Sequence, residues 1–347
     1  MAVLRHFSKK LLLNNVKLDV GAQINNNIWT CLRMLSYSAI PYDGNPDPRP
    51  VFIKKEVQSL LKTLTRVDLA KVYAKRKLGE KLEQPVYKFM TDEELQQAFD
   101  EVKKKVDEII QMPPVVPVRK PIDRVLSRDP GLQGFDTSPF VFTDITYGIR
   151  DSERIILVRD TDGNLKEADW DLRNRMNQIY FPMPGRSVKM PRMFQDHFLE
   201  DLLKRQEYNF ILDRACLQFE PNDPVYQKVV SVTYQHVSDN NKFDDLRSTR
   251  HFGTLAFFLA WHKMIDNLLL DVIESEHIDE AHALVKLHSQ IHQVKFESDD
   301  SFQAVEEYIK KISTKKGALE LALQAYRNAT KERAELEAGI KRAHGLN

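Results

Sequence analysis

Residues 265–288 read IDNLLLDVIESEHIDEAHALVKLH, and this stretch decides the fold class of the chain. Its apolar residues recur at three- and four-residue spacing, the period of a helix that buries one face. The first set is Leu268, Leu269, Val272 and Ile273, and the second is Ile278, Ala281, Leu284 and Val285. Only a short polar segment separates the two sets, so the stretch predicts consecutive helices that pack as an antiparallel pair.

The same spacing continues on both sides of this pair. Further apolar sets, each on one helical face, are Tyr208, Ile211, Leu212, Ala215, Cys216 and Phe219; Tyr226, Val229, Val230, Thr233 and Val237; Phe252, Leu255, Ala256 and Leu259; Phe302, Val305, Ile309 and Ile312; and Leu319, Leu323 and Tyr326. Gly317 is expected to break the run from Phe302 to Tyr326 into two helices. We therefore expect residues 193–347 to form an α-helical domain of stacked antiparallel hairpins.

A small antiparallel β element is expected in the centre of the chain, over residues 131–192. The strand-forming runs are 140–142, 145–147 and 154–159, and Asp162 with Gly163 supplies a hairpin turn into a strand at 164–166. Asp169 can cap a short helix that ends near Tyr180.

The segments before this element are expected to be extended, with a few helices. Residues 41–50 and 112–121 each hold four prolines, which remove backbone donors and favour an extended path. Between them, Thr91 and Glu94 form the signature of a capping box that begins a helix. Residues 41–130 thus combine a linker, helices and a proline-rich segment, and the fold class of the whole chain is mainly α.

Residues 1–40 differ in composition from the rest of the chain. They carry five Lys and Arg residues against one acidic residue, Asp19, and a helix there would place Leu4, Phe7 and Leu11 on one face. A basic, acid-poor, amphipathic segment is typical of a mitochondrial transit peptide. We expect import into the mitochondrion, the alternative being a frayed N-terminus of a cytosolic protein.

The sequence contains no motif that indicates catalysis. Glycine-rich phosphate loops, the G-x-S-x-G elbow and H-E-x-x-H do not occur, and Cys31 and Cys216 are too few for a disulfide framework. His288 and His292, four residues apart, come nearest to a metal site, but no third ligand is indicated. We expect no catalytic residue, metal, cofactor or small-molecule substrate, and no membrane span, because no run of apolar residues is long enough.

Basic residues gather in three places that suit a phosphate backbone. The clusters are Lys71, Lys75, Arg76, Lys77 and Lys81; Arg173, Arg175, Arg186, Lys189 and Arg192; and Arg247 with Arg250. The second cluster is free of acidic residues from Leu172 to Gln195 and is interleaved with aromatic rings, so phosphate contacts and base stacking are both available. We take these as candidate RNA-binding residues, and the alternative is a solvated charged face.

The chain as a whole is electrically balanced, with Lys+Arg 51 against Asp+Glu 50. Acidic stretches such as Glu274 to Glu280 and Glu297 to Glu307 cannot face phosphate and suit basic proteins or solvent. Separate basic and acidic surfaces fit a bridge between RNA and protein.

Segments spread along most of the chain carry a resemblance to a known family. They are VFTDITYGI (141–149), ERIILVRD (153–160), RMNQIYFPMPGR (175–186), FEPNDPVYQKV (219–229), FDDLRSTRHFG (243–253), IDNLLLDVIESEHIDEAHALVKLH (265–288) and KGALELALQAY (316–326), with weaker matches at 56–65, 87–95 and 111–115. In this order they resemble the animal mitochondrial small-subunit ribosomal protein twenty-two family. The resemblance covers residues 55 to 326, approximately, and none of these segments is a catalytic motif found in unrelated proteins.

The resemblance implies a structural constituent of the small subunit of the mitochondrial ribosome, located in the matrix and lacking an active site. Its partners would be the small-subunit mitochondrial rRNA and other small-subunit proteins, which it would bridge. A free helical-hairpin RNA-binding factor for mitochondrial transcripts is the alternative, although such modular readers carry repeats with base-reading positions and none is found here. A metal-dependent enzyme that uses His288 and His292 is a third hypothesis.

Overall fold

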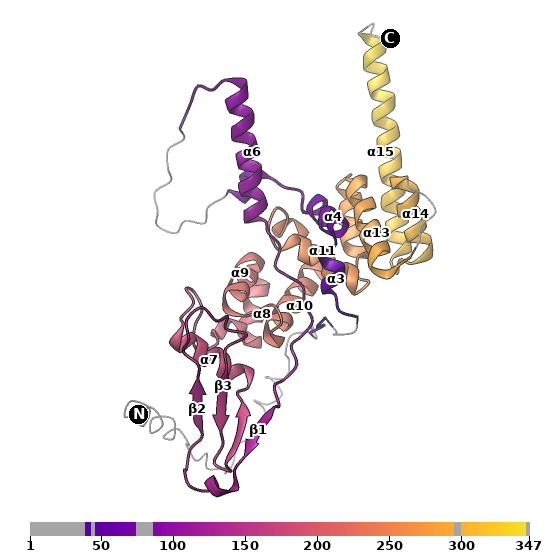
Figure 1. Cartoon of the computed structure of the whole chain (residues 1–347). Coiled ribbons are helices and arrows are strands. Elements are labelled where there is room, and N and C mark those ends of the chain that lie inside the picture. Colours follow the sequence, from indigo (N-terminus) through magenta and orange to yellow (C-terminus); the bar gives the residue numbers. More distant parts are fainter. Residues whose placement is uncertain (1–38, 43–45, 74–85, 295–299, 345–347) are drawn as a thin grey trace. The chain divides into compact units, whose positions relative to one another are not determined.

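The computed structural model of the chain describes residues 39–42, 46–73, 86–294 and 300–344 (Figure 1). Two compact units emerge from its contacts. The first, called here the sheet unit, comprises residues 119–200. The second, called the helical unit, comprises the described parts of residues 37–118 and 201–347.

The sheet unit is a four-stranded antiparallel sheet with one long helix. Its elements are β1 (Val125–Arg128), β2 (Phe140–Thr143), β3 (Ile156–Arg159), β4 (Asn164–Glu167) and α7 (Trp170–Tyr180), with short 3-10 turns η1 (Pro130–Leu132) and η2 (Arg192–Phe194). The strand order is β1-β4-β3-β2, so β1 and β2 lie at the edges. α8 (Asp196–Lys204) follows and links the two units in sequence.

The hairpin of β3 and β4 turns where the sequence predicted, at Asp162 and Gly163. The Asp160 N–H donates to the Asn164 carbonyl at 2.9 Å, and Gly163 has a φ of 82°. A Cβ at position 163 would stand 2.1 Å from the carbonyl oxygen of Asp129, so no residue larger than glycine fits there. This close approach also lets the Asp129 N–H donate to the Gly163 carbonyl at 3.2 Å.

The core of the sheet unit lies between one face of the sheet and α7. Ile156, Val158 and Ala168 are buried there, and Val141, Leu172 and Met176 pack against them. Val141 and Val158 are paired across β2 and β3 and therefore point to the same face. The helix completes a core that a small sheet cannot bury by itself.

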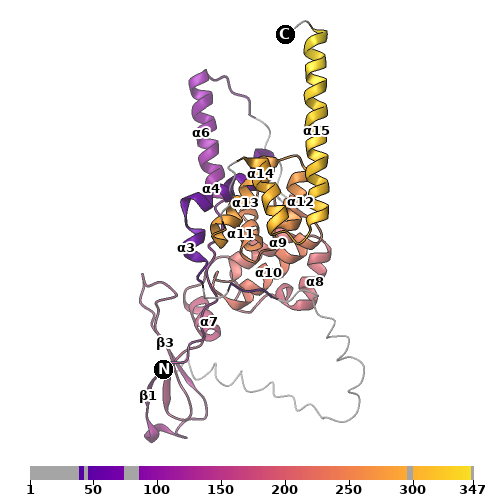
Figure 2. The ribbon, with the colours of Figure 1, turned by 90° about the vertical axis from the view of Figure 1, so that its right-hand side faces the viewer.

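The helical unit contains the remaining elements. They are α3 (Arg49–Phe52), α4 (Lys55–Thr65), α5 (Leu69–Val72), α6 (Asp92–Ile109), α9 (Tyr208–Gln218), α10 (Pro224–Asp239), η3 (Phe243–Asp245), α11 (Phe252–Trp261), α12 (Asp266–Glu274), α13 (Ile278–His292), α14 (Ser301–Lys311) and α15 (Lys316–Ala343). Neighbouring helices pack in pairs, among them α9 with α10, α12 with α13 and α13 with α14. Figure 2 shows α6 and α15 extending beyond this packed body.

α11 lies at the centre of the helical unit. Its residues from Phe252 to Ala260 are all buried, which agrees with the uniformly apolar sequence FGTLAFFLA. α4, from the N-terminal part of the chain, packs against α11 and α13 through Val57, Leu61 and Leu64, each fully buried. The N-terminal segment therefore completes the core of the C-terminal helices.

The predicted fold class is confirmed: the chain is mainly helical with a small antiparallel sheet. One strand was missed and one local prediction was wrong. β1 was not predicted, because all four of its residues are exposed and show no alternation. The predicted strand at 145–147 is a turn, because the Asp144 carboxylate accepts hydrogen bonds from the N–H and hydroxyl of Thr146 at 2.9 and 2.6 Å.

Within the described residues, no helix has both the length and the apolar character needed to cross a membrane.

Candidate nucleic-acid interface

α7 holds the basic residues of the sheet unit on a helix that is fixed at its start. Asp169 caps the helix by accepting a hydrogen bond from the Leu172 N–H at 2.9 Å, as predicted from the sequence. Leu172 and Met176 then pack on the sheet, which sets the direction of every side chain between them. The arginines of α7 consequently lie in two different environments.

Arg173 faces the sheet and is only 7% exposed. Its guanidinium donates to the carbonyls of Arg154 at 2.8 Å and Ser152 at 3.3 Å, and it lies 5.5 Å from the Trp170 ring. These contacts satisfy donors that burial would otherwise leave unpaired. Arg173 therefore holds the connection between β2 and β3 against α7.

Arg154 is a second buried arginine, which sequence reasoning missed because ERIILVRD was interpreted only as a strand. Its guanidinium donates to the carbonyls of Asp144 and Thr146, both at 2.9 Å, and of Ile149 at 3.1 Å. It also lies 3.7 Å from the centre of the Phe181 ring, close enough for a cation–π contact. Arg154 thus shapes the turn at 144–149 and supports the ring that follows α7.

Tyr147 stands next to this arginine–aromatic pair, and sequence reasoning missed it as well. Its ring meets Phe181 edge-on, with centroids 5.7 Å apart and an interplanar angle of 89°, yet 88% of the residue is exposed. Tyr180, at the end of α7, is 47% exposed. Aromatic rings held on one side and open on the other are suited to stacking with unpaired bases.

Of the remaining basic residues of this cluster, three are exposed and one is half-buried. Arg175, Lys189 and Arg192 are exposed, on α7 and in the segment that follows it. Arg186 is half-buried, and its backbone closes a turn by donating to the Met183 carbonyl at 3.2 Å. Of the five residues predicted here, the three exposed ones have the accessibility that phosphate binding requires.

The predicted lysine-rich cluster lies mostly outside the described residues. Lys75, Arg76, Lys77 and Lys81 fall within the segment 74–85, for which the structure gives no description. Lys71 is exposed on α5, and its ammonium group donates to the Asp244 carbonyl.

Arg247 is placed in the core of the helical unit and is 4% exposed. Its guanidinium lies 3.0 Å from a Glu280 carboxylate oxygen and 3.3 Å from one of Asp271, and it donates to the Leu64 carbonyl at 2.9 Å. Burial raises the pKa of the Asp271 carboxyl, although the charge of Arg247 opposes this rise. The guanidinium is engaged on three sides by its own chain.

Arg250 is half-buried and pairs with Asp213 at 2.8 Å. The same carboxylate lies 2.9 Å from Nε2 of His251, whose pKa is lowered by burial despite this contact. Arg247 thus belongs to a buried ion-pair network of the helical unit and Arg250 to a partly exposed one, whereas the exposed basic cluster belongs to the sheet unit.

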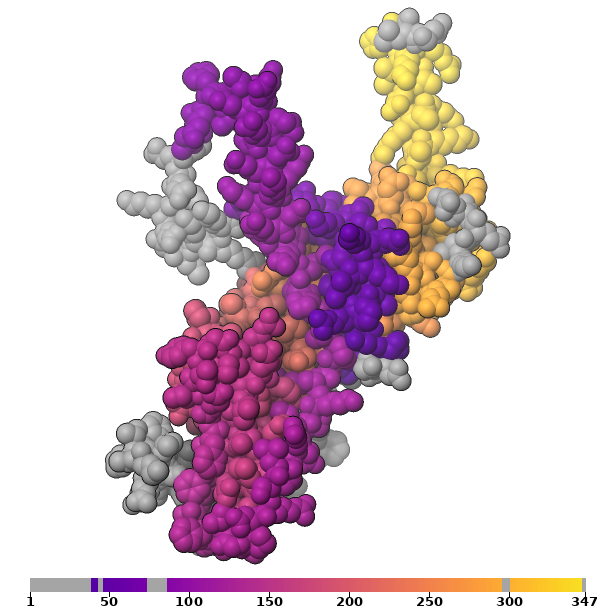
Figure 3. Space-filling model, viewed as in Figure 1, coloured from indigo at the N-terminus to yellow at the C-terminus, as the bar shows by residue number. Residues whose placement is uncertain are grey.

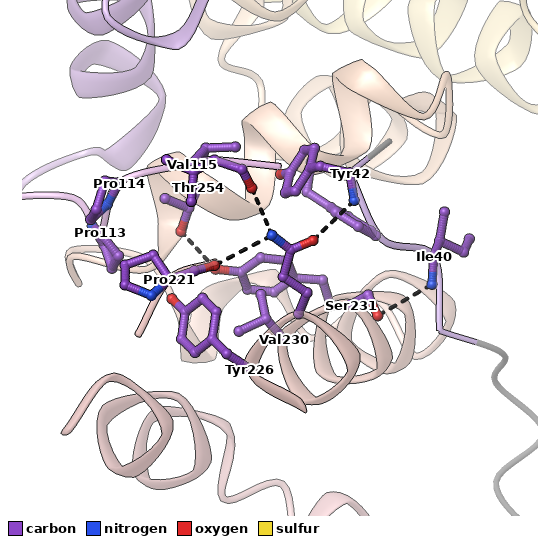
Figure 4. Close-up of a pocket in the computed structure, with 14 residues that line it drawn as sticks. Ile40, Tyr42, Pro113, Pro114, Val115, Pro221, Tyr226, Val230, Ser231 and Thr254 are labelled. Carbon is purple, nitrogen blue, oxygen red and sulfur yellow. Dashed lines mark hydrogen bonds between the residues drawn. The ribbon is translucent and has the colours of Figure 1, made fainter. Parts of the chain in front are cut away.

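A narrow pocket in the helical unit lies between α10, α11 and two extended segments. Figure 4 shows Ile40 and Tyr42 from one segment and Pro113, Pro114 and Val115 from the other. The Gln227 side chain joins them: its Oε1 accepts from the Tyr42 N–H at 3.2 Å, and its Nε2 donates to the Val116 carbonyl at 2.6 Å. The Ile40 N–H donates to Ser231 Oγ at 3.3 Å. The pocket therefore lies where two extended segments of this same chain bind to α10.

The predicted histidine pair does lie side by side. The rings of His288 and His292 are 4.5 Å apart, and Nε2 of His292 contacts the Ala260 carbonyl at 2.8 Å. Among the described residues, no three His, Cys, Asp or Glu side chains come together in a way that could hold a metal ion. Cys216 is half-buried, 3.5 Å from the Tyr226 hydroxyl, and burial raises the pKa of its thiol.

Comparison with known proteins identifies similar chains over both units. The model of the family described as Mitochondrial 28S ribosomal protein S22 matches residues 50–293. Small ribosomal subunit protein mS22 of Bos taurus is 37% identical over 294 residues, which cover 82% of this chain and 81% of that protein. The Mus musculus protein of the same name is 36% identical over 285 residues, covering 80% of this chain and 79% of its own. The matched region includes α6, the sheet unit and the α4–α11 core.

Proposed function

Because the chain belongs to the mitochondrial 28S ribosomal protein S22 family, we propose that it is a structural constituent of the small subunit of the mitochondrial ribosome. The observation that carries this proposal is a similarity that runs through both units rather than through one segment. The expected test result is co-sedimentation of the tagged protein with the small subunit in a gradient of mitochondrial lysate. Recovery of the protein only in light fractions, with intact small subunits present, would contradict the proposal and favour a free RNA-binding factor.

The role that we infer is architectural and includes no catalytic step. It rests on the family rather than on the absence of a motif. The chain would bind rRNA through its basic surface and other small-subunit proteins through its acidic ones. Such bridging fits its balanced total charge.

The RNA contact that we propose is the exposed part of the α7 cluster. Arg175, Lys189 and Arg192 supply positive charge, while Tyr147 and Tyr180 supply open aromatic faces. Arg173 and Arg154 contribute indirectly, because they fix α7 and the 144–149 turn in place. Arg247 and Arg250 are assigned to the stability of the helical unit, since their guanidinium groups contact carboxylates of the same chain.

We also propose that the protein acts in the mitochondrial matrix after removal of a transit peptide within residues 1–40. Ile40 and Tyr42 are bound to α10, and Tyr42 is 8% exposed. Cleavage upstream of residue 39 would leave this anchor intact. Mass spectrometry of the N-terminal peptide from purified mitochondria tests the position.

A further inference from the structure

Residues 86–101, called here the α6 arm, expose an unusual amount of apolar surface. The arm comprises the extended segment VYKFM and the outer turns of α6. Tyr87 is 90% exposed and Phe89 is fully exposed, while Leu95 and Phe99 on the helix are 46% and 49% exposed. Single exposed apolar residues are ordinary, but Leu95 and Phe99 are neighbours on one helix face, and adjacent exposed residues of this size indicate an interaction site.

The inner end of α6 is fixed to the helical unit, so the arm has a defined base. Val106 is 5% exposed, Lys62 forms an ion pair with Asp107 at 2.9 Å, and the Tyr73 hydroxyl donates to the Val102 carbonyl at 3.4 Å. The outer turns project away from the body of this unit (Figures 1 and 2). In the space-filling view, the outer part of α6, in purple, forms a projection from the helical unit (Figure 3).

The start of the helix is stabilised locally rather than by tertiary packing. Thr91 Oγ1 accepts from the Glu94 N–H at 3.3 Å, and the Glu94 carboxylate accepts from the Thr91 N–H at 2.9 Å. This capping box satisfies two N–H groups that a projecting helix would otherwise expose unpaired. The outer turns of α6 can therefore be helical before a partner covers their apolar face.

The outer turns of α6 are acidic beside the apolar stripe, whereas the basic residues nearest to it are Lys88, before the helix, and Lys103, one turn after Phe99. Residues 91–101 include five carboxylates and no basic residue. On the helix, Asp92 and Asp100 lie on one side of the Leu95–Phe99 stripe, while Glu94 and Glu101 lie on the other. First-turn carboxylates also favour the helix dipole. Beyond the first turn, Asp100 lies 3.9 Å from the ammonium group of Lys103 in an exposed pair, and such a pair leaves the carboxylate accessible to a partner.

This combination selects the kind of partner. Carboxylates on both sides of the stripe repel phosphate, so the arm does not suit rRNA. Apolar side chains gain stability by leaving water, and acidic rims attract lysine and arginine. The complementary surface is a groove or helix with an apolar strip flanked by basic residues.

We propose that the α6 arm is a docking surface for a neighbouring small-subunit protein that presents an apolar strip flanked by lysine and arginine. The inference rests on the proposed ribosomal function and adds a second surface to it. The sheet unit contacts RNA, and the arm of the helical unit contacts protein.

The test places the photoreactive residue p-benzoylphenylalanine at position 99 of the full chain, in cells depleted of the unmodified protein. Small subunits are collected from a gradient, irradiated and analysed by mass spectrometry. We expect an RNase-resistant adduct with a protein, joined through a segment rich in lysine and arginine. An adduct with rRNA, an adduct with an acidic segment, or no adduct would each overturn the proposal.

The control carries the same probe at Gln97, on the opposite, polar face of α6, and should give little adduct. Leu95 is a second probe position that serves if the Phe99 replacement prevents folding. Reversing two rim charges, with Asp100→Lys and Glu101→Lys, should lower the adduct yield about fivefold, the effect of losing two exposed ion pairs. An unchanged yield would contradict the role of charge.

These outcomes separate the two proposals. Absence of the unmodified chain from small-subunit fractions contradicts the ribosomal function itself. Presence of the chain there without a protein adduct at position 99 or 95 contradicts only the role of the α6 arm.

Discussion

The guanidinium of Arg247 lies 3.0 Å from a carboxylate oxygen of Glu280, and both residues are almost completely buried. The same carboxylate receives two hydrogen bonds from Arg66, at 2.7 and 2.8 Å. Because Arg66 follows α4 and Arg247 precedes α11, Glu280 on α13 joins three parts of the helical unit that are distant in sequence. Removing this carboxylate would leave a buried positive charge without its main partner.

We predict that Glu280→Ala lowers the free energy of unfolding by roughly 3–5 kcal/mol, the usual cost of breaking a buried ion pair on one side. This change in the free energy of unfolding is measured by urea denaturation, monitored by circular dichroism. The matched control is Glu276→Ala, which breaks the exposed pair between Glu276 and Arg333 and should cost about 1 kcal/mol or less. Equal losses for the two variants would show that the buried network contributes no more to stability than an exposed ion pair.

Replacing Gln227 should loosen both extended segments that cross α10. Gln227→Ala leaves the Tyr42 N–H and the Val116 carbonyl without their partner, at a cost of about 1–3 kcal/mol. We expect lower stability in urea together with faster cleavage near residues 39–50 and 112–121 by proteinase K. Gln97→Ala, on the exposed face of α6, is the control. A loss of stability without faster cleavage at these segments would contradict the clamping role.

The α7 cluster should separate into residues that bind and residues that hold the fold. The triple variant Arg175→Glu, Lys189→Glu and Arg192→Glu changes exposed side chains, so its stability should stay within about 0.5 kcal/mol of wild type for each substitution. Its incorporation into the small subunit, measured by gradient sedimentation, should nevertheless fall. Normal incorporation would contradict RNA binding and support the alternative, in which these residues form a solvated charged face.

Arg173→Met provides the contrast to that variant. It removes the hydrogen bonds to the Arg154 and Ser152 carbonyls inside the sheet unit and should reduce stability. If Arg173→Met instead leaves the unfolding curve unchanged and reduces incorporation, Arg173 contacts RNA directly.

Local signals in the sequence were sufficient to predict much of the fold. The capping box of Thr91 and Glu94, the Asp169 cap and the turn at Gly163 each depend on residues close in sequence, and the structure confirms all three. The site was harder to predict, because a charged residue's exposure depends on tertiary packing. Arg175 and Arg173 are two residues apart on one helix, yet one faces solvent and the other the sheet.

Long-range pairing explains the remaining differences. Nothing near Arg247 in the sequence indicates that Glu280 and the end of α4 will enclose it. Likewise, Arg154 acquires its role only when Phe181, far along the chain, comes to lie against it. Charge counting alone therefore overestimates the number of basic residues available to a partner.

His288 should make the helical unit sensitive to acid. It is 2% exposed on α13, and neither ring nitrogen has a hydrogen-bond partner among the described residues. Burial, followed by the nearby His292 and Lys263, lowers its pKa from 6.5 to about 4, while Asp266 acts in the opposite direction.

The direction of this pH effect depends on which state, folded or unfolded, binds a proton at His288 first as the pH falls. The folded state keeps His288 neutral below pH 6.5, whereas the unfolded chain takes up a proton there, so stability is lost as the pH falls from 6.5 towards 4. We predict that His288→Leu flattens this part of the profile of urea midpoint against pH, whereas His277→Leu, at an exposed position before α13, does not. Because His251 is also buried, with a lowered pKa, some acid sensitivity should remain in the His288→Leu variant. Profiles that run parallel for His288→Leu and wild type would show that protonation of His288 is not linked to unfolding.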